Sequence, residues 1–221
     1  GLSAVCQHRG HLLGSETGNT KHLICPFHSW SYDLTGKLTS APEMNAHIKL
    51  ADLRETHSLP ELKVEEWRGF LFVCFSDSPP KLGERLGRLS EEVHNHHIEE
   101  LVATPTVDWD DQLWNWKFMH ENAIEPYHTA YLHQKVHDFA PSTKATFAEW
   151  VDEDDGAIYH PTGFNYMDGN FTPNFRSMFP PIETLTKSER ERVMFACLMP
   201  NLFFAAVPDG VLYYLLLPKG A

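Results

Sequence analysis

Two short stretches of this 221-residue chain each hold a cysteine and a histidine at close spacing. Cys6 and His8 form a C-x-H pair, and Cys25 and His28 form a C-x-x-H pair. Two thiolates and two imidazoles can bind one tetrahedral zinc ion, or a 2Fe-2S cluster that has both histidines on one iron. Zinc fingers usually pair cysteine with cysteine and histidine with histidine along the chain, so the mixed pairs favour the iron–sulfur cluster. Such a cluster transfers single electrons.

A second group of possible metal ligands lies in the middle of the chain. Glu125 and His128 are three residues apart, which puts both on one side of a helix. His133 follows five residues after His128, and an ideal helix rotates by about 140° over that distance. A helix end, a π-bulge or the disruption caused by Pro126 is therefore needed to bring both imidazoles to one ion. From the spacing alone, a structural helix and a metal site both remain open.

Short strands and tight turns must position the first group of ligands. His22–Cys25 is expected to be a strand that leads into the second pair. Ser31–Asp33 is expected to run into a turn at residues 34–37 and to return through Leu38. The sequence thus predicts a small antiparallel β unit that holds two ligand loops.

An apolar strand and then a turn-rich segment follow this unit. Residues 65–69 predict a turn, and Phe70–Phe75 predicts a strand. Ser76–Pro80 is rich in turn-forming residues. We therefore expect a domain boundary there, between a first domain at residues 1–79 and a second at residues 80–221.

The second domain is predicted to contain helices. Apolar residues recur at helical spacing over Leu82–Leu101, which predicts an amphipathic helix. His94, His96 and His97 lie on it, and we expect them on its solvated face rather than at a metal. At least one long helix is expected to pack on an antiparallel sheet.

Two hairpins are expected in that sheet. Phe147–Val151 and Ala157–Tyr159 flank the acidic turn Asp152–Gly156, which explains the acidic run without a metal. Asn201–Val207 and Val211–Leu217 flank a Pro-Asp-Gly turn. The fold class is therefore α+β, with a small antiparallel-β domain followed by helices packed on an antiparallel sheet.

The composition limits the functions that this chain can have. Apolar residues make up 42% of it, which is enough for a core, and its net charge is −12. An acidic surface repels phosphates, which argues against nucleic acid and anionic membranes as partners. We find neither a leader nor an apolar run of about 18 residues, so the cytoplasm is the simplest location. The cysteine spacing suits no disulfide framework, and we expect Cys74 and Cys197 to be buried and inert.

The residues around the first group resemble a known family. CQHRG at residues 6–10 and CPFHSWSYDLTGKL at residues 25–38 are similar to the two ligand loops of the Rieske domain of ring-hydroxylating, non-haem iron oxygenases. The resemblance implies that Gly10 and Trp30 pack around a Rieske 2Fe-2S cluster. It implies the following cluster ligands: Cys6, His8, Cys25 and His28.

The second group resembles the iron-binding segment of the same family. The matching sequence is NWKFMHENAIEPYHTAYLH at residues 115–133. The resemblance implies that His128 and His133 bind a mononuclear Fe(II), and that Asn122 lies near it. Glu125 matches the acidic residue that connects the cluster of one protomer to the iron of its neighbour.

The family's third iron ligand is an aspartate in a later helix. We expect it to lie outside these 221 residues, and we expect the chain to be an internal part of a longer subunit. The aspartates after His133 come too early or lie in turns: Asp138, Asp152, Asp154, Asp155, Asp168 and Asp209.

The resemblance implies a terminal oxygenase component. A flavin reductase, with or without a ferredoxin, would pass electrons from NAD(P)H to the cluster, and the iron would activate O2 to hydroxylate a small organic substrate. Three reactions remain open: ring dihydroxylation in aromatic hydrocarbon catabolism, monohydroxylation and oxidative demethylation. The family also implies a homo-oligomer, a trimer, in which a small subunit is optional. The competing hypotheses are an electron-transfer module without oxygenase chemistry and a zinc-binding domain.

Other chemistry-bearing residues have less specific settings. The aromatic-rich segment Phe164–Phe179 either lines an apolar pocket or packs as core or lid. His120, His137 and His160 are expected at the surface or behind the metal ligands.

Overall fold

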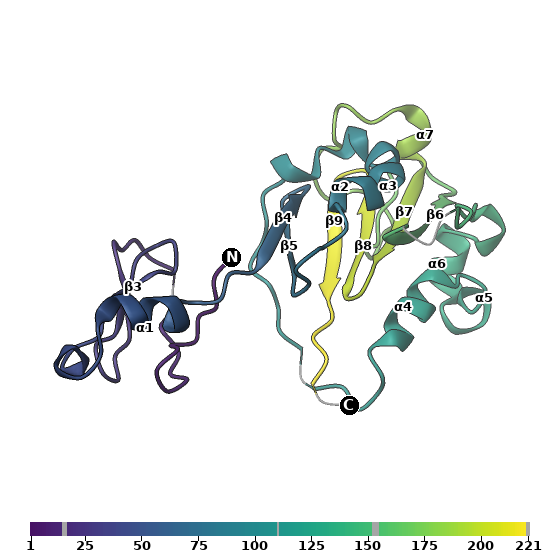
Figure 1. Cartoon of the computed structure of the whole chain (residues 1–221). Helices are drawn as coiled ribbons and strands as arrows, with labels where there is room; N and C mark the ends of the chain where they lie inside the picture. The colour runs from purple at the N-terminus through teal and green to yellow at the C-terminus, as the bar shows by residue number, and fades with distance from the viewer. Residues whose placement is uncertain (15–16, 110, 152–154, 220–221) are drawn as a thin grey trace. The chain divides into compact units, whose positions relative to one another are not determined.

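The computed structural model describes residues 1–14, 17–109, 111–151 and 155–219. The chain divides into two compact units (Figure 1). The first unit comprises Gly1–Glu66 and Leu71–Pro79, and the second comprises Trp67–Phe70 and Pro80–Ala221.

The first unit is built on short antiparallel strands. β1 (Leu23–Ile24), β2 (Ser31–Tyr32) and β3 (Leu38–Ser40) form a sheet in that order, which confirms the predicted β unit. Asp33 fixes the turn between β2 and β3, because its carboxylate accepts hydrogen bonds from both the N–H and the hydroxyl of Thr35.

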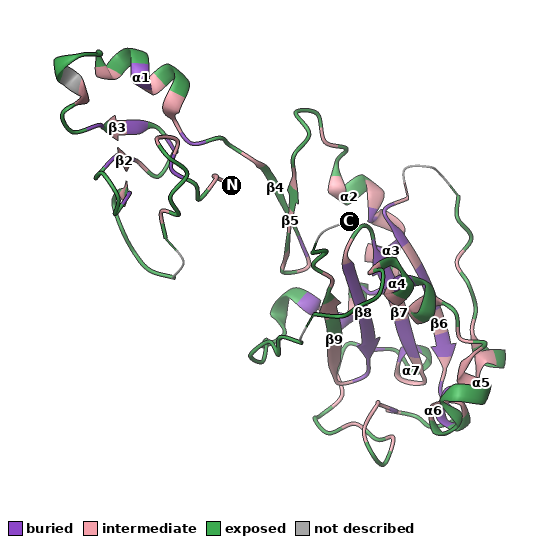
Figure 2. Ribbon diagram, turned by 90° about the horizontal axis from the view of Figure 1, so that it is seen from below, coloured by how far each residue is buried: buried purple, intermediate pink, exposed green. Residues whose placement is uncertain are grey.

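The two cysteines predicted to be cluster ligands belong to the core of this unit. Helix α1 (Leu50–His57) follows the 3₁₀ turn η1 (Met44–Ala46) and packs against β3. Arg54 on α1 donates to the Leu38 carbonyl over 2.8 Å. The core of this unit consists of the following buried residues: Cys6, Cys25, Trp30, Tyr32, Leu38, Ala41, Leu53 and Leu59. Figure 2 colours the ribbon of both units by burial.

A hairpin follows, and it corrects one expectation. β4 (Lys63–Trp67) pairs with β5 (Phe70–Cys74), so residues 65–67 are strand and not turn. The turn is confined to Arg68 and Gly69, which have φ values of 50° and 84°. The acidic side chains of β4 remain in solvent, so they carry no burial penalty in a strand. Cys74 was expected to be buried, but it is only half-buried.

The single helix expected at Leu82–Leu101 is wrong. Leu86 and Val93 have φ values of −106° and −108°, and His97 has a positive φ of 44°. Gly87 also lowers helix stability, by about 1 kcal/mol relative to alanine. The segment forms these short helices instead: α2 (Leu82–Arg85), α3 (Gly87–Glu92), η2 (His94–His96) and η3 (Ile98–Glu100).

These breaks turn one histidine inward. His94 is exposed as expected, but His96 is only 3% exposed. Burial lowers the pKa of His96 to about 4, although the nearby Glu189 carboxylate opposes the shift. The expectation of a wholly solvated histidine face is therefore wrong for His96.

The second unit is centred on an antiparallel sheet. Its strand order is β6 (Ala157–Gly163), β7 (Arg192–Leu198), β8 (Leu202–Val207) and β9 (Gly210–Leu215). The predicted hairpin of the last two strands is confirmed, with Val207 paired to Gly210. β7 was not predicted, and it is the hydrogen-bonded neighbour of β6.

The other predicted hairpin is wrong in one arm. Phe147–Val151 is not a strand, although the N–H of Ala148 donates to the Tyr159 carbonyl over 3.2 Å. Asp152, Glu153 and Asp154 of the acidic turn lie outside the described residues.

The helices that pack on this sheet are short. None in the described part of the chain exceeds eight residues, so the expected long helix is wrong, and none is long and apolar enough to cross a membrane. The helices that complete the second unit are α4 (Lys117–Ile124), α5 (Thr129–Leu132), α6 (Gln134–Phe139), η4 (Ser142–Lys144) and α7 (Lys187–Arg190).

The aromatic segment is partly core and partly surface. Phe164 is buried and stacks on Phe139 at 4.3 Å between ring centroids, whereas Met178 and Phe179 are exposed. Cys197 is buried in the same core, as predicted, and burial raises the pKa of its thiol to about 12.

Candidate metal centres

Two loops of similar backbone geometry carry the predicted cluster ligands. In the first loop, the N–H of Gly10 donates to the Cys6 carbonyl over 3.0 Å. In the second, the N–H of Ser29 donates to the Cys25 carbonyl over 2.9 Å. Gly10 and Ser29 both have a positive φ, of 73° and 57°. Each loop therefore turns back on its own cysteine four residues later.

These loops sort the four ligands into a thiol pair and an imidazole pair. Cys6 and Cys25 are 1% and 2% exposed. The rings of His8 and His28 lie 4.7 Å apart between centroids, edge to face. Trp30 is buried and stacks on His8 at 4.6 Å, as a residue that shields the site must do.

Hydrogen-bond donors converge on the sulfur of Cys6. Burial raises the pKa of this thiol, but the Tyr32 hydroxyl, the backbone of His8 and Arg9, and the Cys25 thiol together outweigh burial and lower it. The Tyr32 oxygen lies 3.3 Å from Sγ of Cys6. Burial, helped by its contact with Cys6, raises the pKa of Tyr32, so this hydroxyl keeps its proton at neutral pH. The hydrogen bonds to Cys6 thus favour the thiolate form of this residue.

The histidine of the first loop is held neutral. Burial, followed by the neighbouring His28, lowers the pKa of His8. Metals bind the neutral imidazole, so this shift favours a ligand role.

The paired arrangement fits a cluster better than a single ion. Across the described residues, no three cysteine, histidine or acidic side chains are grouped so that they could hold one metal ion. A tetrahedral zinc site needs four ligands about one point, whereas a Rieske cluster takes two thiolates on one iron and two imidazoles on the other. The observed thiol and imidazole pairs match the second pattern.

A proline shapes the start of the second group. Helix α4 ends at Ile124, and Glu125 is extended with φ −99° and ψ 99°. Pro126 has no N–H and disfavours a helical residue before it, which accounts for this end.

The two histidines lie at opposite ends of a single helical turn. α5 extends over Thr129–Leu132 only, with His128 before it and His133 after it. His133 leaves helical geometry, with φ −125° and ψ 53°. The two rings come to 5.3 Å between centroids at an angle of 79°. The helix end that the five-residue spacing requires is therefore present.

Glu125 is bonded to the first of these histidines. Its carboxylate accepts from Nδ1 of His128 over 3.2 Å, and also from the N–H groups of His128 and Tyr127. A carboxylate at Nδ1 fixes the tautomer and directs Nε2 outward for a metal. The Glu125 side chain is 51% exposed, so it remains accessible from outside the unit.

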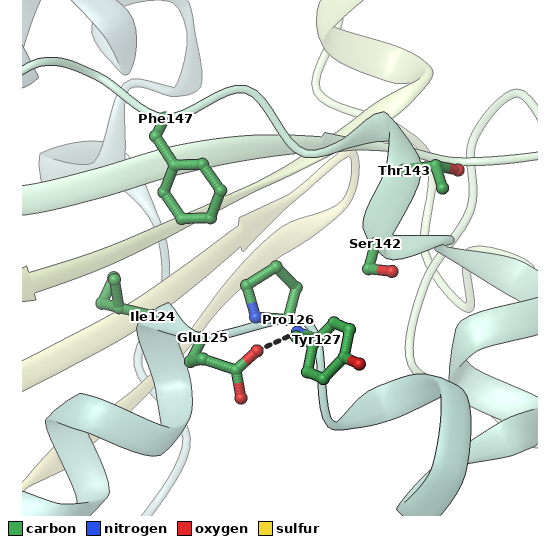
Figure 3. A pocket seen from close by; sticks show the side chains of 7 residues that line it. All are labelled: Ile124, Glu125, Pro126, Tyr127, Ser142, Thr143 and Phe147. Atoms are coloured by element: carbon green, nitrogen blue, oxygen red, sulfur yellow. Dashed lines mark hydrogen bonds between the residues drawn. The ribbon is translucent and has the colours of Figure 1, made fainter.

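An open pocket of about 440 Å³ adjoins this carboxylate (Figure 3). Its lining is mostly apolar and consists of Ile124, Glu125, Pro126, Tyr127, Ser142, Thr143 and Phe147. Asn122, which was expected near the iron, is exposed on α4 and is not part of this lining.

Among the residues that the structure describes, no carboxylate completes a three-ligand metal site with His128 and His133. Asp168 forms a two-pronged ion pair with Arg190, at 2.6 and 2.8 Å. Asp209 accepts hydrogen bonds from the N–H groups of Met178 and Phe179. Asp155 is bonded to Arg88, and Asp152 and Asp154 lie outside the described residues. The two imidazoles thus fit two of the three positions of a two-histidine, one-carboxylate iron centre.

Three further histidines, which were expected at the surface or behind the metal ligands, are wholly or partly buried. His120 and His160 are buried, and His137 is half-buried with Nδ1 3.2 Å from the Thr129 hydroxyl. His120 places Nε2 2.9 Å from the Pro200 carbonyl and so joins α4 to the β7–β8 turn. His160 and Thr162 are two residues apart on β6 and both are buried, but Tyr159 is buried as well, so the strand shows no simple alternation that would have revealed His160.

Family models match nearly the whole chain. The Rieske [2Fe-2S] domain matches residues 1–63, and the ring hydroxylating alpha subunit (catalytic domain) matches residues 90–221.

Curated relatives are oxygenase subunits. The carnitine monooxygenase oxygenase subunit of Acinetobacter pittii is 34% identical over 137 residues, 58% of this chain and 35% of the relative. The glycine betaine monooxygenase oxygenase subunit of Pseudomonas aeruginosa is 33% identical over 154 residues, which are 68% of this chain and 33% of the relative. The N,N-dimethyl phenylurea N-demethylase subunit alpha of a Sphingobium species is 33% identical over 139 residues, which are 60% of this chain and 30% of the relative. The chain spans about a third of the length of these relatives.

Solved structures share the fold. A quaternary ammonium Rieske monooxygenase superposes with a TM-score of 0.69 at 23% identity, over 94% of this chain and 51% of that one. A naphthalene 1,2-dioxygenase from Rhodococcus superposes with a TM-score of 0.63 at 20% identity, over 99% of this chain and 59% of that one. Two ligand loops of the Rieske type, followed by a histidine pair in a matching catalytic domain, lead to one assignment: the chain belongs to the family of ring-hydroxylating alpha subunits, with a Rieske [2Fe-2S] domain ahead of its catalytic domain.

Proposed function

We propose that this chain belongs to a terminal oxygenase component. It would take electrons that originate from NAD(P)H, relay them through a Rieske cluster and use them to activate O2 at a non-haem Fe(II), which hydroxylates a small organic substrate. One observation carries the proposal: a single chain contains an imidazole pair 4.7 Å apart at the cluster loops and another 5.3 Å apart beside Glu125. An electron-transfer module alone has no use for the second pair.

The proposed metal groups divide the chemistry between them. When bound, the cluster supplies one-electron transfer and the iron supplies dioxygen activation. The cluster would be held by Cys6, Cys25, His8 and His28, and the iron by His128, His133 and a further carboxylate.

The chain's own polar groups prepare these ligands. The Tyr32 hydroxyl stabilises the thiolate of Cys6 through the 3.3 Å contact. Glu125 holds the proton at Nδ1 of His128 and leaves Nε2 unprotonated. Because the second oxygen of Glu125 binds the N–H of Tyr127, the carboxylate orientation is fixed by the backbone. These contacts determine where each ligand lone pair points.

Glu125 is the proposed link between the two metal centres. We place it between the cluster of one protomer and the iron of a neighbouring protomer in a homo-oligomer, proposed to be a trimer. Its exposure and its bond to His128 support this role, since an exposed carboxylate can also accept a hydrogen bond from a histidine of a second subunit.

A flavin reductase, with or without a ferredoxin, is the proposed electron donor, and the cytoplasm is the proposed location.

The proposed substrates are N-methylated amines. The relatives that share 33–34% identity with this chain are named for carnitine, glycine betaine and an N,N-dimethyl phenylurea, each of which carries N-methyl groups. Aromatic ring dihydroxylation has weaker support, because the naphthalene dioxygenase is similar at the level of the fold. Hydroxylation of an N-methyl carbon gives a hemiaminal that breaks down to the shorter amine and formaldehyde.

Metal and sulfide analysis of the full-length subunit, combined with EPR, tests this function. We expect a Rieske signal together with iron beyond the two atoms of the cluster. Iron equal to the sulfide would leave only an electron-transfer module, and colourless zinc protein would rule out both. With reductase and NAD(P)H, N-methylated amines should produce formaldehyde in step with O2 consumption.

A further inference from the structure

Helix α5 is too short to hold its own shape. It extends over only four residues, and the proposed iron ligands His128 and His133 adjoin its two ends. A single helical turn fixes several backbone angles for one or two hydrogen bonds, so it is unstable without support from the rest of the fold. Contacts outside α5 must therefore maintain the geometry that brings the two imidazole rings to 5.3 Å between centroids.

One such contact involves the hydroxyl of Thr129, the first residue of α5. This hydroxyl donates to the carbonyl of Pro126 over 2.7 Å, and the N–H of Thr129 donates to the same carbonyl over 3.2 Å. Because a carbonyl oxygen only accepts, the hydroxyl proton is used in the first of these bonds. The turn that follows Glu125 and contains His128 is thus closed by two hydrogen bonds.

The oxygen of this hydroxyl also contacts a histidine of α6. Nδ1 of His137 lies 3.2 Å from Oγ1 of Thr129, and both residues are half-buried. A hydroxyl oxygen can accept from an imidazole N–H while its own proton bonds a carbonyl. A chain of contacts therefore leads from His137 through Thr129 to the carbonyl of Pro126.

Helix α6 is the fixed end of this chain. Its last residue, Phe139, is 1% exposed and stacks on Phe164 at 4.3 Å between ring centroids. The carbonyl of Phe139 accepts from the N–H of Asn165 over 2.9 Å. α6 also packs against α5 (Figure 1). A side chain of α6 that bonds α5 can therefore hold α5 in a constant position relative to the core.

We propose that His137 is a positioning residue for the proposed iron centre and that it acts through the hydroxyl of Thr129. The brace consists of these two side chains and the carbonyl of Pro126. It holds the turn from which His128 extends, and so sets the position of this ring relative to that of His133. The inference rests on the proposed function, in which these two imidazoles bind an iron.

Matched substitutions in the full-length subunit separate the brace from packing. Thr129→Val keeps the shape of the side chain and removes the hydroxyl, whereas Thr129→Ser keeps the hydroxyl. His137→Leu fills a similar space without a polar atom, whereas His137→Asn retains an amide near the position of Nδ1. We expect the valine and leucine variants to lose the brace and the serine and asparagine variants to keep it.

Amide hydrogen exchange measures the brace without any metal. The N–H groups of Tyr131 and Leu132 donate to the His128 carbonyl. In the metal-free subunit we expect both to exchange about tenfold faster in Thr129→Val and in His137→Leu, and at close to the wild-type rate in the serine and asparagine variants. Exchange in β8 should not change in any of them.

A titration with Fe(II) addresses the ligand geometry. With the mononuclear site of the full-length subunit emptied under anaerobic conditions, Fe(II) should bind about tenfold more weakly to Thr129→Val and to His137→Leu. The serine and asparagine variants should bind it as the wild type does. The double variant should bind it about as weakly as either single variant, because both changes remove the same brace. The Rieske EPR signal should stay unchanged throughout.

Several outcomes overturn the inference. Equal behaviour of the valine and serine variants, or additive losses in the double variant, would show that packing holds α5. Nitrogen NMR of the wild type should find a proton on Nδ1 of His137, which is measurable even if a variant does not fold. A bare Nδ1, accepting from the N–H of Ser142 at 3.5 Å, would also overturn the inference. If exchange responds as expected but the wild type binds no mononuclear iron, the brace stands and the proposed function fails.

Discussion

The two loops that carry the proposed cluster ligands close on their own cysteines, whereas the proposed iron ligands flank a one-turn helix that follows a proline. Cys6 and Cys25 are buried, and each loop is closed by a hydrogen bond from the fourth residue after its cysteine. His133 and Glu125, in contrast, are exposed. The four proposed cluster donors come from two loops of one small β unit. The proposed iron donors depend on a helix break and on a carboxylate at His128, and no third ligand is grouped with them among the described residues.

The difference bears on how each centre is assembled. A site made from adjacent loops can form as soon as the small β unit folds, and its metal then contributes to folding. A site assembled from separate elements requires those elements to be packed first. The two centres should therefore fail in different ways when they are perturbed.

The largest expected effect is loss of the cluster in Cys25→Ser. The hydroxyl of serine is not a thiolate, so visible absorption and acid-labile sulfide should fall to near zero, and the melting temperature of the first unit should fall with them. The matched control is Cys74→Ser, at a half-buried thiol outside the ligand loops. Equal loss of colour in both variants would contradict the ligand assignment.

His128→Ala in the full-length subunit should remove the mononuclear iron and leave the cluster intact. Iron analysis should then show only the two irons of the cluster, with the Rieske EPR signal unchanged. His94→Ala, at an exposed histidine of the same unit, is the control. Loss of the cluster signal in His128→Ala would mean that the two centres do not assemble independently.

Acid should destabilise the second unit, because two neutral histidines are buried in it. His96 and His160 are neutral and buried, with pKa values of about 4 against about 6.5 in an unfolded chain. The unfolded state therefore binds more protons between these values, so stability is complete above pH 6.5 and is lost as the pH falls towards 4. Each histidine contributes on the order of 3 kcal/mol over that range.

Urea unfolding of the metal-free chain at pH 7, 5.5 and 4.5 measures this loss. His96→Phe should reduce the slope with pH by about half, since one of the two histidines then no longer titrates. A pH-independent midpoint between 7 and 4.5 would show that these histidines are not buried in solution.

The smallest expected effect is a change in the stability of the first unit when the two ligand loops are altered at the same loop position. Gly10 and Ser29 occupy the same position of the loop with a positive φ, but only glycine adopts it without strain. Gly10 has no neighbouring atoms within 4 Å of an added Cβ, so Gly10→Ala tests conformation alone. We expect it to destabilise the first unit by about 1 kcal/mol and Ser29→Gly to stabilise it by about 0.5–1 kcal/mol. Thermal melting checks both, and the same sign for both would refute the equivalence of the loops.

The cluster region could be predicted from the sequence because its information is local. Ligand pairs, strand alternation and the Asp33 turn lie within a few residues of one another, and the predicted strands β1 to β3 were confirmed. The β8–β9 hairpin was predicted for the same reason, from two apolar runs about a Pro-Asp-Gly turn.

The errors lie where tertiary contacts overrule local pattern. Apolar spacing over Leu82–Leu101 suited one helix, yet the chain breaks at Leu86 and at Val93, and His96 is turned into the core. β7 was missed because its residues face core on both sides and show no alternation. The position of the Glu125 carboxylate likewise depends on Tyr127 and His128, which spacing alone does not resolve.

The distribution of thiols in the two units has a practical consequence. Cys197 is sealed in the core with a pKa of about 12, and the two loop cysteines are expected to be occupied whenever the cluster is loaded. Cys74, half-buried on β5, is then the one thiol among the chain's four that an alkylating reagent should reach readily. A fluorophore or spin label attached there would mark the β4–β5 hairpin, and the number of labels taken up per chain would report directly how much cluster a preparation contains.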